Sequence, residues 1–159
     1  EFKDYYLGDA DGWGRMESAV RRTMNAFLNS KGGRLIFGLT DKGLVKGLQL
    51  ERPMRDRLRL TVDTVVNEMY PQVDMNHVQY GIKFIPIMNL VGQEMADRVL
   101  TVISMDADPH LDENGVYFTD RSCQSAYRRA SASCQRMQEE LVDDRIRRAN
   151  QIRREKGMR

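Results

Sequence analysis

The sequence predicts an α+β domain in which a mixed or antiparallel sheet is flanked by helices. Apolar residues recur at helical spacing in separate stretches, and short apolar runs bounded by Gly and Pro lie between them. These patterns do not alternate regularly, as a doubly wound parallel sheet would require. The length of 159 residues fits one domain spanning 1–159, with enough chain to bury a core.

The first half of the chain is expected to contain a strand, two helices and a hairpin. A short strand at 1–6 leads through a glycine-rich loop to an amphipathic helix over 13–28, which a Gly-Gly pair ends. Two apolar runs joined by a polar turn predict a β-hairpin over 34–48. A second helix over 53–69 begins at one proline and ends before another.

The second half is expected to contain more strands and one final helix. A strand region over 78–90 is interrupted by Pro86, so this strand should lie at an edge or carry a bulge. A further strand covers 98–105, and a last hairpin is predicted within 116–128. A serine can cap a long, charged helix over 131–159, which has one apolar stripe.

Charge is distributed unevenly along the chain. The formal net charge is +2, but residues 121–159 hold 11 Lys and Arg against 5 Asp and Glu. A basic C-terminal third beside an acidic body suggests a polyanionic partner. For the arginines of the final helix, a solvated helix face remains the favoured alternative.

Other classes of protein and site are disfavoured by what the sequence lacks. No apolar run approaches the roughly 18 residues of a membrane span, so we expect no membrane segment. The two cysteines and two histidines have no zinc-ligand spacing, and two cysteines do not form a disulfide framework. A reducing compartment, and hence a cytoplasmic location, is the natural expectation.

Basic and aromatic residues are interleaved near the start of the C-terminal third. Arg121, Arg128 and Arg129 lie close in sequence to Tyr117 and Tyr127. This mixture suits an RNA surface, through phosphate contacts and base stacking. A mixed, solvated surface strand explains it equally well, and both interpretations stay open.

Three stretches resemble the AlbA-type domain of the Schlafen family. Residues 1–3 read Glu-Phe-Lys, like a strand of that family. Residues 26–41 match its helix end, Gly-Gly turn, apolar strand and acidic residue, and residues 116–131 are similar to its late aromatic strand. With one copy of the domain, a single lobe, the chain most resembles the stand-alone Schlafen-like proteins of animals.

The resemblance implies an RNA-binding subunit of a metal-dependent endoribonuclease that acts on structured RNA or on small-RNA precursors such as those of piRNA. Glu1 and Asp41 match two of the family's three carboxylates, which would hold Mg²⁺ or Mn²⁺. Clustered carboxylates suit this chemistry, because the ion activates water and neutralises charge on the phosphate. The third carboxylate precedes residue 1. Lys3 is a candidate phosphate contact. The family's zinc-binding Cys/His set is missing.

Simpler interpretations and rival functions remain. From sequence spacing alone, the favoured interpretation is that Glu1 is a solvated terminal residue and Asp41 an ordinary turn residue. The rival functions are a non-catalytic nucleic-acid-binding or scaffold subunit and a protein-interaction domain that acts through its last helix. Because the larger Schlafens pair two lobes around RNA, the resemblance also implies a dimer with a second copy or with a related subunit.

Overall fold

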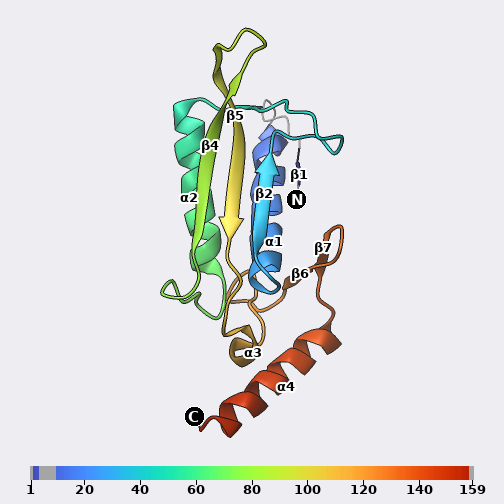
Figure 1. Ribbon diagram of the computed structural model, residues 1–159. Coiled ribbons are helices and arrows are strands. Elements are labelled where there is room, and N and C mark those ends of the chain that lie inside the picture. Colours follow the sequence, from blue (N-terminus) through green and yellow to red (C-terminus); the bar gives the residue numbers. More distant parts are fainter. Residues whose placement is uncertain (1, 4–9, 158–159) are drawn as a thin grey trace.

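The structure is a computed structural model that describes residues 2–3 and 10–157 (Figure 1). It has the predicted α+β architecture. In chain order the elements are β1 (Phe2–Lys3), α1 (Ala10–Leu28), β2 (Gly33–Phe37), β3 (Leu48–Gln49), α2 (Arg52–Glu68), β4 (Tyr80–Met88), β5 (Glu94–Met105), α3 (Leu111–Asn114), β6 (Tyr127–Arg129), β7 (Cys134–Arg136) and α4 (Glu139–Glu155).

The long strand β5 organises the main sheet. Its segment from Thr101 to Met105 pairs antiparallel with β2 on one edge and with β4 on the other. The short strand β3 continues the β2 edge, where Leu48 lies opposite Val99. Strand β1 adds to β2 in parallel, with Phe2 opposite Ile36. The sheet is therefore mixed, as the sequence predicts.

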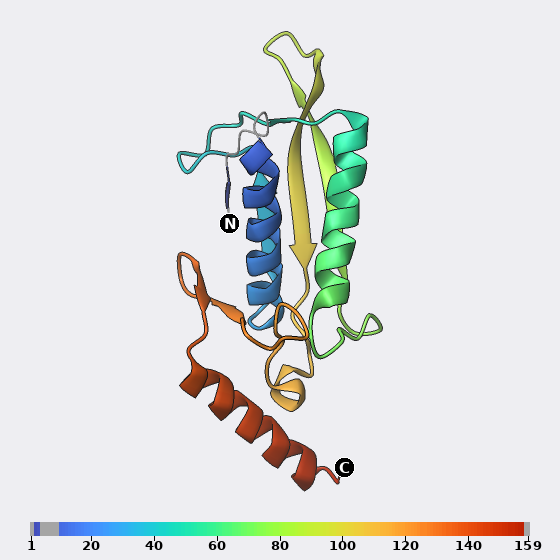
Figure 2. The same ribbon diagram turned by 180° about the vertical axis from the view of Figure 1, so that it is seen from behind.

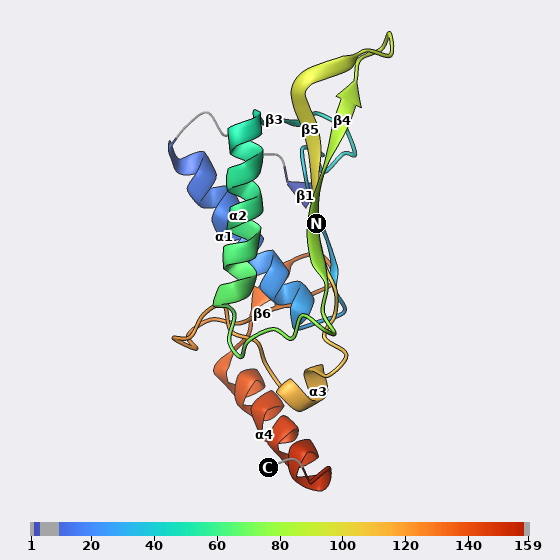
Figure 3. The same ribbon diagram turned by 90° about the vertical axis from the view of Figure 1, so that its left-hand side faces the viewer.

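Helices α1 and α2 cover the same face of this sheet (Figures 2 and 3). Side chains alternate across a strand, so every second residue of β5 points toward the helices. The core between the layers includes Val20 and Met24 of α1, Leu58 and Val62 of α2, Leu35 and Phe37 of β2, and Val99, Ile103 and Met105 of β5. Each fully buried apolar side chain contributes roughly 1.5–3 kcal/mol.

The strand over 80–88 fits the expectation drawn from Pro86. Among the described residues β4 pairs with β5 alone, so it is an edge strand. The pairing register shifts between Pro86 and Met88. Proline has no N–H to donate to a neighbouring strand, which explains why it lies at a free edge beside an irregularity.

The predicted hairpin over 34–48 is only partly correct. The chain does turn back at 41–43, where Leu39 and Val45 form an isolated bridge. However, β2 does not pair with β3, because both pair with β5. The local turn was readable from the sequence. The pairing of β2 and β3 with β5 could not be predicted from the sequence, because pairing with a distant strand leaves no local signal.

Two further boundaries differ from the prediction. The segment 116–118 does not pair with 126–128: Phe118 bridges to Tyr70 instead, and β6 pairs with β7. The final helix does not begin after a serine near residue 131, because that part of 131–159 holds β7. It begins at Glu139, and its N-cap Gln138 makes no side-chain capping bond.

Two buried asparagines attach the C-terminal third to α1. The Asn29 side chain donates from Nδ2 to the carbonyls of Tyr117 and Tyr127 and accepts from the Tyr117 N–H. Asn25 donates to the Tyr117 carbonyl and accepts from the Tyr127 N–H at 2.7 Å. Buried amides are costly unless bonded, so these contacts fix β6 against the end of α1.

The Gly-Gly turn after α1 is structural. A Cβ on Gly32 would lie 2.8 Å from backbone atoms of Met105 and Ala107, and the residue has φ +73°. Only glycine fits this close approach of two chain segments.

None of the helices in the described part of the chain is both long and apolar enough to span a membrane.

Candidate nucleic-acid interface

Asp41 lies in a hydrogen-bonded turn beyond the end of β2. Thr40 and Leu44 are joined by a bond from the Thr40 N–H to the Leu44 carbonyl at 3.0 Å, and the Thr40 hydroxyl accepts from the Leu44 N–H. At the base of the turn, a Cβ on Gly38 would lie 2.7 Å from the Cα of Gly47. The glycine at each of these positions therefore lets the two strands of the turn cross closely.

The carboxylate of Asp41 is exposed at this turn. Glu1, its expected partner, lies outside the described residues. Within residues 2–3 and 10–157, no group of three or more His, Cys, Asp or Glu side chains could hold a metal ion. The described residues therefore supply one carboxylate of the implied metal site, and they do not form that site by themselves.

Strand β1 places Lys3 beside the end of β2. Lys3 is opposite Phe37 in the register, and Phe37 is the last residue of β2 before the chain continues to Asp41. The backbone thus brings the Phe2–Lys3 strand next to the strand that leads to the turn. The structure describes the backbone of Lys3 and not its side chain.

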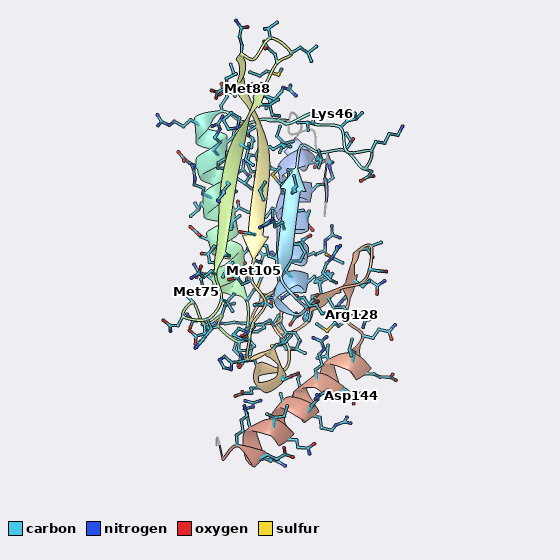
Figure 4. All side chains as sticks on the ribbon, viewed as in Figure 1. Lys46, Met75, Met88, Met105, Arg128 and Asp144 are labelled. Carbon is cyan, nitrogen blue, oxygen red and sulfur yellow. The ribbon has the colours of Figure 1, made fainter. Side chains whose placement is uncertain are left out.

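Arg128 and Arg129 lie side by side on β6 but have different surroundings. Arg128 is exposed, and its side chain extends outward in Figure 4. Arg129 is half-buried: its guanidinium lies 5.9 Å from the ring centroid of Phe27 and donates to Cys134 Sγ. Of the two, Arg128 is the better placed to contact a phosphate, while Arg129 holds β6 against α1.

Arg128 is also electrostatically close to Arg145 of α4. Burial lowers the pKa of Arg145, and the positive charge of Arg128 lowers this pKa further. The Arg145 guanidinium donates to the Asn29 carbonyl at 3.0 Å, at the C-terminal end of α1. A cation there is favourable, because the last carbonyls of a helix carry partial negative charge. Arg145 thus holds α4 against the end of α1, and Arg128 is the exposed cation nearby.

Arg121 belongs to a different surface. It lines an open hollow of about 580 Å³ together with Arg21, Glu68 and Asp120. Arg21 forms an ion pair with Glu68, and hydrogen bonds from Ser122 lower the pKa of Asp120. The charges around Arg121 are therefore mixed, and this arginine does not join the pair on β6.

Tyr117 does not present a ring for base stacking. The side chain is fully buried, and its hydroxyl donates to Asp108 Oδ2 at 2.8 Å. Burial raises the pKa of Tyr117 well above its ordinary value, and the hydrogen bond to Asp108 raises it further. Tyr127 is half-buried on β6. The aromatic part of the predicted RNA surface is thus largely core.

Comparison with protein-family models decides which family this domain comes from. The model described as "Schlafen, AlbA_2" matches residues 1–138. The chain belongs to the Schlafen AlbA_2 family. Membership of this family indicates a nucleic-acid-binding domain, which agrees with the resemblance seen in residues 1–3, 26–41 and 116–131.

A solved structure has a similar fold. The DIP2311 protein from Corynebacterium diphtheriae matches with a TM-score of 0.51 at 18% sequence identity. The match covers 92% of this chain and 23% of that one, so the Schlafen domain described here spans about a quarter of its length. At this identity the likeness extends to the fold.

The sheet of this Schlafen domain carries two cations that sequence reasoning missed. Leu35 of β2 and Phe84 of β4 pack in or against the core, so their neighbours Arg34 and Lys83 point to the opposite face. Both are exposed. The alternation of apolar and basic residues in 82–84 is the sequence signal that could have found Lys83, whereas Arg34 precedes a continuous apolar run and leaves no such signal.

Proposed function

We propose that this Schlafen domain binds RNA and contributes to a divalent-metal-dependent endoribonuclease that acts on structured RNA or small-RNA precursors. The observation that carries the proposal is the position of Asp41. Its exposed carboxylate follows β2 in a hydrogen-bonded turn, and β2 lies beside β1, the Phe2–Lys3 strand. Family membership supports the nucleic-acid part of the proposal.

Glu1 and Asp41 are the residues that would hold Mg²⁺ or Mn²⁺. Such an ion, bound by carboxylates, supplies an activated water and neutralises charge on the scissile phosphate. Arg128 and Lys3 would hold the RNA backbone, and Arg121 would offer a second, separate contact. Arg129 would act mainly by positioning β6.

A related subunit is part of this proposal. The described residues contribute a single carboxylate at the turn, so the remaining ligands would come from Glu1, from the family's third carboxylate, or from a partner. The location that we propose is cytoplasmic.

The test is cleavage of an end-labelled structured RNA in the presence of Mn²⁺, with and without EDTA. The protein should be used at its natural full length, and candidate partner subunits should be added in parallel. We expect cleavage that requires the metal and falls by about a hundredfold or more in Asp41→Asn, which keeps the size of the side chain and removes its charge.

Asp144→Asn is the matched control, because Asp144 is an exposed aspartate of α4, far from the turn (Figure 4). This variant should cleave like the wild type. RNA binding without cleavage, unchanged by Asp41→Asn and by any partner, would contradict the nuclease. That outcome would support the alternative, a subunit that holds nucleic acid for another enzyme.

A further inference from the structure

A small pocket lies where α3 meets the middle of α4 (Figures 1 and 3). Gly115, which follows α3, brings the two helices close together, because a Cβ on this glycine would lie 3.1 Å from the Cβ of Ala149. The pocket has a volume of about 200 Å³ and is lined by Leu111, Asp112, Gly115, Arg145 and Arg148. It is therefore part of the packed contact between two helices.

Arginines dominate the charge of this pocket. Arg145 and Arg148 are three residues apart on α4, so their side chains extend from the same face of the helix. Burial lowers the pKa of Arg145, and the positive charge of Arg128 on β6 lowers this pKa further. Asp112 contributes a negative charge, which raises the same pKa. With Arg128 counted, the cations outnumber this carboxylate, so the pocket attracts anions.

The guanidinium of Arg148 is available to a ligand. It is exposed, and it makes no hydrogen bond or ion pair with the part of the chain that the structure describes. Neighbouring charges are already paired, Lys156 with Glu113 of α3, and Arg147 with Asp144 at 3.2 Å. A guanidinium presents its N–H donors in a planar fork, and this arrangement binds a phosphate through two parallel bonds.

The lining residues fit a phosphate that is joined to a ribose. Arg145 uses Nη1 to hold the Asn29 carbonyl, and the rest of its guanidinium provides further donors beside those of Arg148. The carboxylate of Asp112 would repel a bare phosphate, but it accepts hydrogen bonds and so suits a sugar hydroxyl, as acidic residues do in nucleotide sites. Leu111 supplies an apolar wall. The small volume leaves room for a single such unit.

We propose that this pocket binds a ribose phosphate unit of RNA. Arg148 and Arg145 hold the phosphate, and Asp112 accepts a hydrogen bond from the 2′-hydroxyl of the ribose. Because deoxyribose lacks this hydroxyl, the pocket favours RNA over DNA. The choice of ligand rests on the proposed binding of RNA, but the pocket is separate from the turn of Asp41. Arg145 reaches the end of α1, before β2 begins, whereas that turn follows β2.

The first test measures binding of a short fluorescent oligouridine RNA to the full chain by fluorescence anisotropy. Arg148→Gln should weaken binding by roughly tenfold, the usual effect of losing hydrogen bonds made by a charged group. Arg147→Gln is the matched control, because it removes the same charge from the preceding residue of α4, which pairs with Asp144, and this variant should bind nearly as tightly as the wild type. Equal losses in both variants would overturn the pocket while leaving RNA binding in place. A wild type that binds no RNA would refute the proposed RNA binding as well.

The second test compares the affinity for this RNA with the affinity for DNA of the same sequence. Asp112→Ala should lower the preference for RNA by roughly tenfold, because the acceptor for the 2′-hydroxyl is lost. Asp143→Ala, at an exposed acid of α4 outside the pocket lining, should leave the preference unchanged. If Asp112→Ala keeps the wild-type preference, the ribose assignment is wrong.

Competition with adenosine monophosphate separates the two sources of a ribose phosphate, an RNA strand and a free nucleotide. We expect the nucleotide to displace labelled RNA from the wild type only at concentrations well above those of unlabelled RNA, because it offers a single phosphate and the strand offers many. A nucleotide that binds more tightly than the RNA would identify a free nucleotide as the ligand and overturn the assignment to RNA.

Discussion

At the scale of single residues, two tyrosine hydroxyls donate hydrogen bonds to carboxylates. Tyr117 bonds Asp108 in the interior, and Tyr80 of β4 bonds Asp63 of α2 at 2.8 Å. Burial raises the pKa of Tyr80 from 10.0 to about 12, and the bond to Asp63 acts in the same direction. Each bond therefore requires a protonated phenol.

The raised pKa of Tyr80 predicts a loss of stability in alkaline solution. The unfolded chain releases this proton near pH 10 and the folded chain near pH 12, so the unfolded state binds fewer protons between these values. The contribution is complete below pH 10 and declines as pH rises toward 12. It is smaller than about 1 kcal/mol, because Asp63 is exposed and water screens the pair.

Urea denaturation of wild type and Tyr80→Phe across this pH range checks the prediction. The free energy of unfolding should fall more steeply with pH in the wild type than in the variant. Tyr70→Phe, at an exposed ring, should leave the wild-type slope unchanged. If Tyr80→Phe and wild type lose stability in parallel, the Tyr80–Asp63 bond does not carry this pH dependence.

Single-residue roles were predictable from sequence only where the signal is local. The exposed turn at Asp41 follows from Asp-Lys-Gly, which favours a turn wherever it stands. The burial of Tyr117 does not, because it depends on Asp108 and on Asn29, whose bond to Tyr117 spans 88 residues. An aromatic residue next to arginines looks the same in sequence whether its ring is stacked on a base or packed in a core.

At the scale of elements, α4 packs mainly on α3 and is otherwise held by a small number of side chains. Its buried residue is Ala149, against which Gly115 packs closely, and Arg145 reaches the end of α1. The sequence predicted an apolar stripe on this helix. The stripe is only half-buried at Leu141 and Val142, so a polar contact contributes to holding the helix in place.

Arg145→Ala should therefore destabilise the protein by about 1.5–3 kcal/mol, the usual range for a hydrogen bond made by a charged group. Arg147→Ala is the matched control: Arg147 pairs with Asp144 at the surface, where such pairs contribute less than about 1 kcal/mol. Urea unfolding followed by the fluorescence of Trp13 and by circular dichroism measures both. If both variants lose the same free energy of unfolding, Arg145 contributes no more to stability than a surface ion pair does.

Helix positions were readable from periodicity, and strand partners were not. Apolar spacing located α2 between its two prolines, and it located α1 although that helix begins earlier than expected, at Ala10. The central position of β5 was missed, because its neighbours β2 and β4 are chosen by packing between distant segments. The start of α4 was missed because a serine is a common cap, whereas Gln138 makes no capping bond.

At the scale of the whole molecule, exposed cations occur on the sheet, at Arg34 and Lys83, and on β6, at Arg128. Arg128 lies on β6, while the segment from Phe84 to Asp97 carries acids alone among its charged residues. Arginines on the outer side of α2 are already engaged: Arg57 lies 4.3 Å from the ring centroid of Trp13, and Arg59 bonds Asp56. We expect the free energy of RNA binding to depend on Arg128, the exposed arginine of β6.

Arg128→Glu should weaken binding of a structured RNA and lower the dependence of affinity on salt, by about one in the slope of log affinity against log salt concentration. Arg52→Glu reverses an exposed charge at the start of α2 and should change neither quantity appreciably. Fluorescence anisotropy at several salt concentrations measures affinity and slope together. Similar losses in both variants would show that the contact with RNA is spread over the surface.

The asparagine contacts at the base of α1 also have a consequence for synthesis of the chain. Asn25 and Asn29 are made early, whereas their partners in Tyr117 and Tyr127 follow 88 to 102 residues later. At ribosomal rates this interval lasts roughly 5–20 s. Until Tyr117 and Tyr127 have been synthesised, water takes the place of these partners at the side chains of Asn25 and Asn29. The C-terminal end of α1 therefore stays hydrated until β6, which carries Arg128 and Arg129, has emerged.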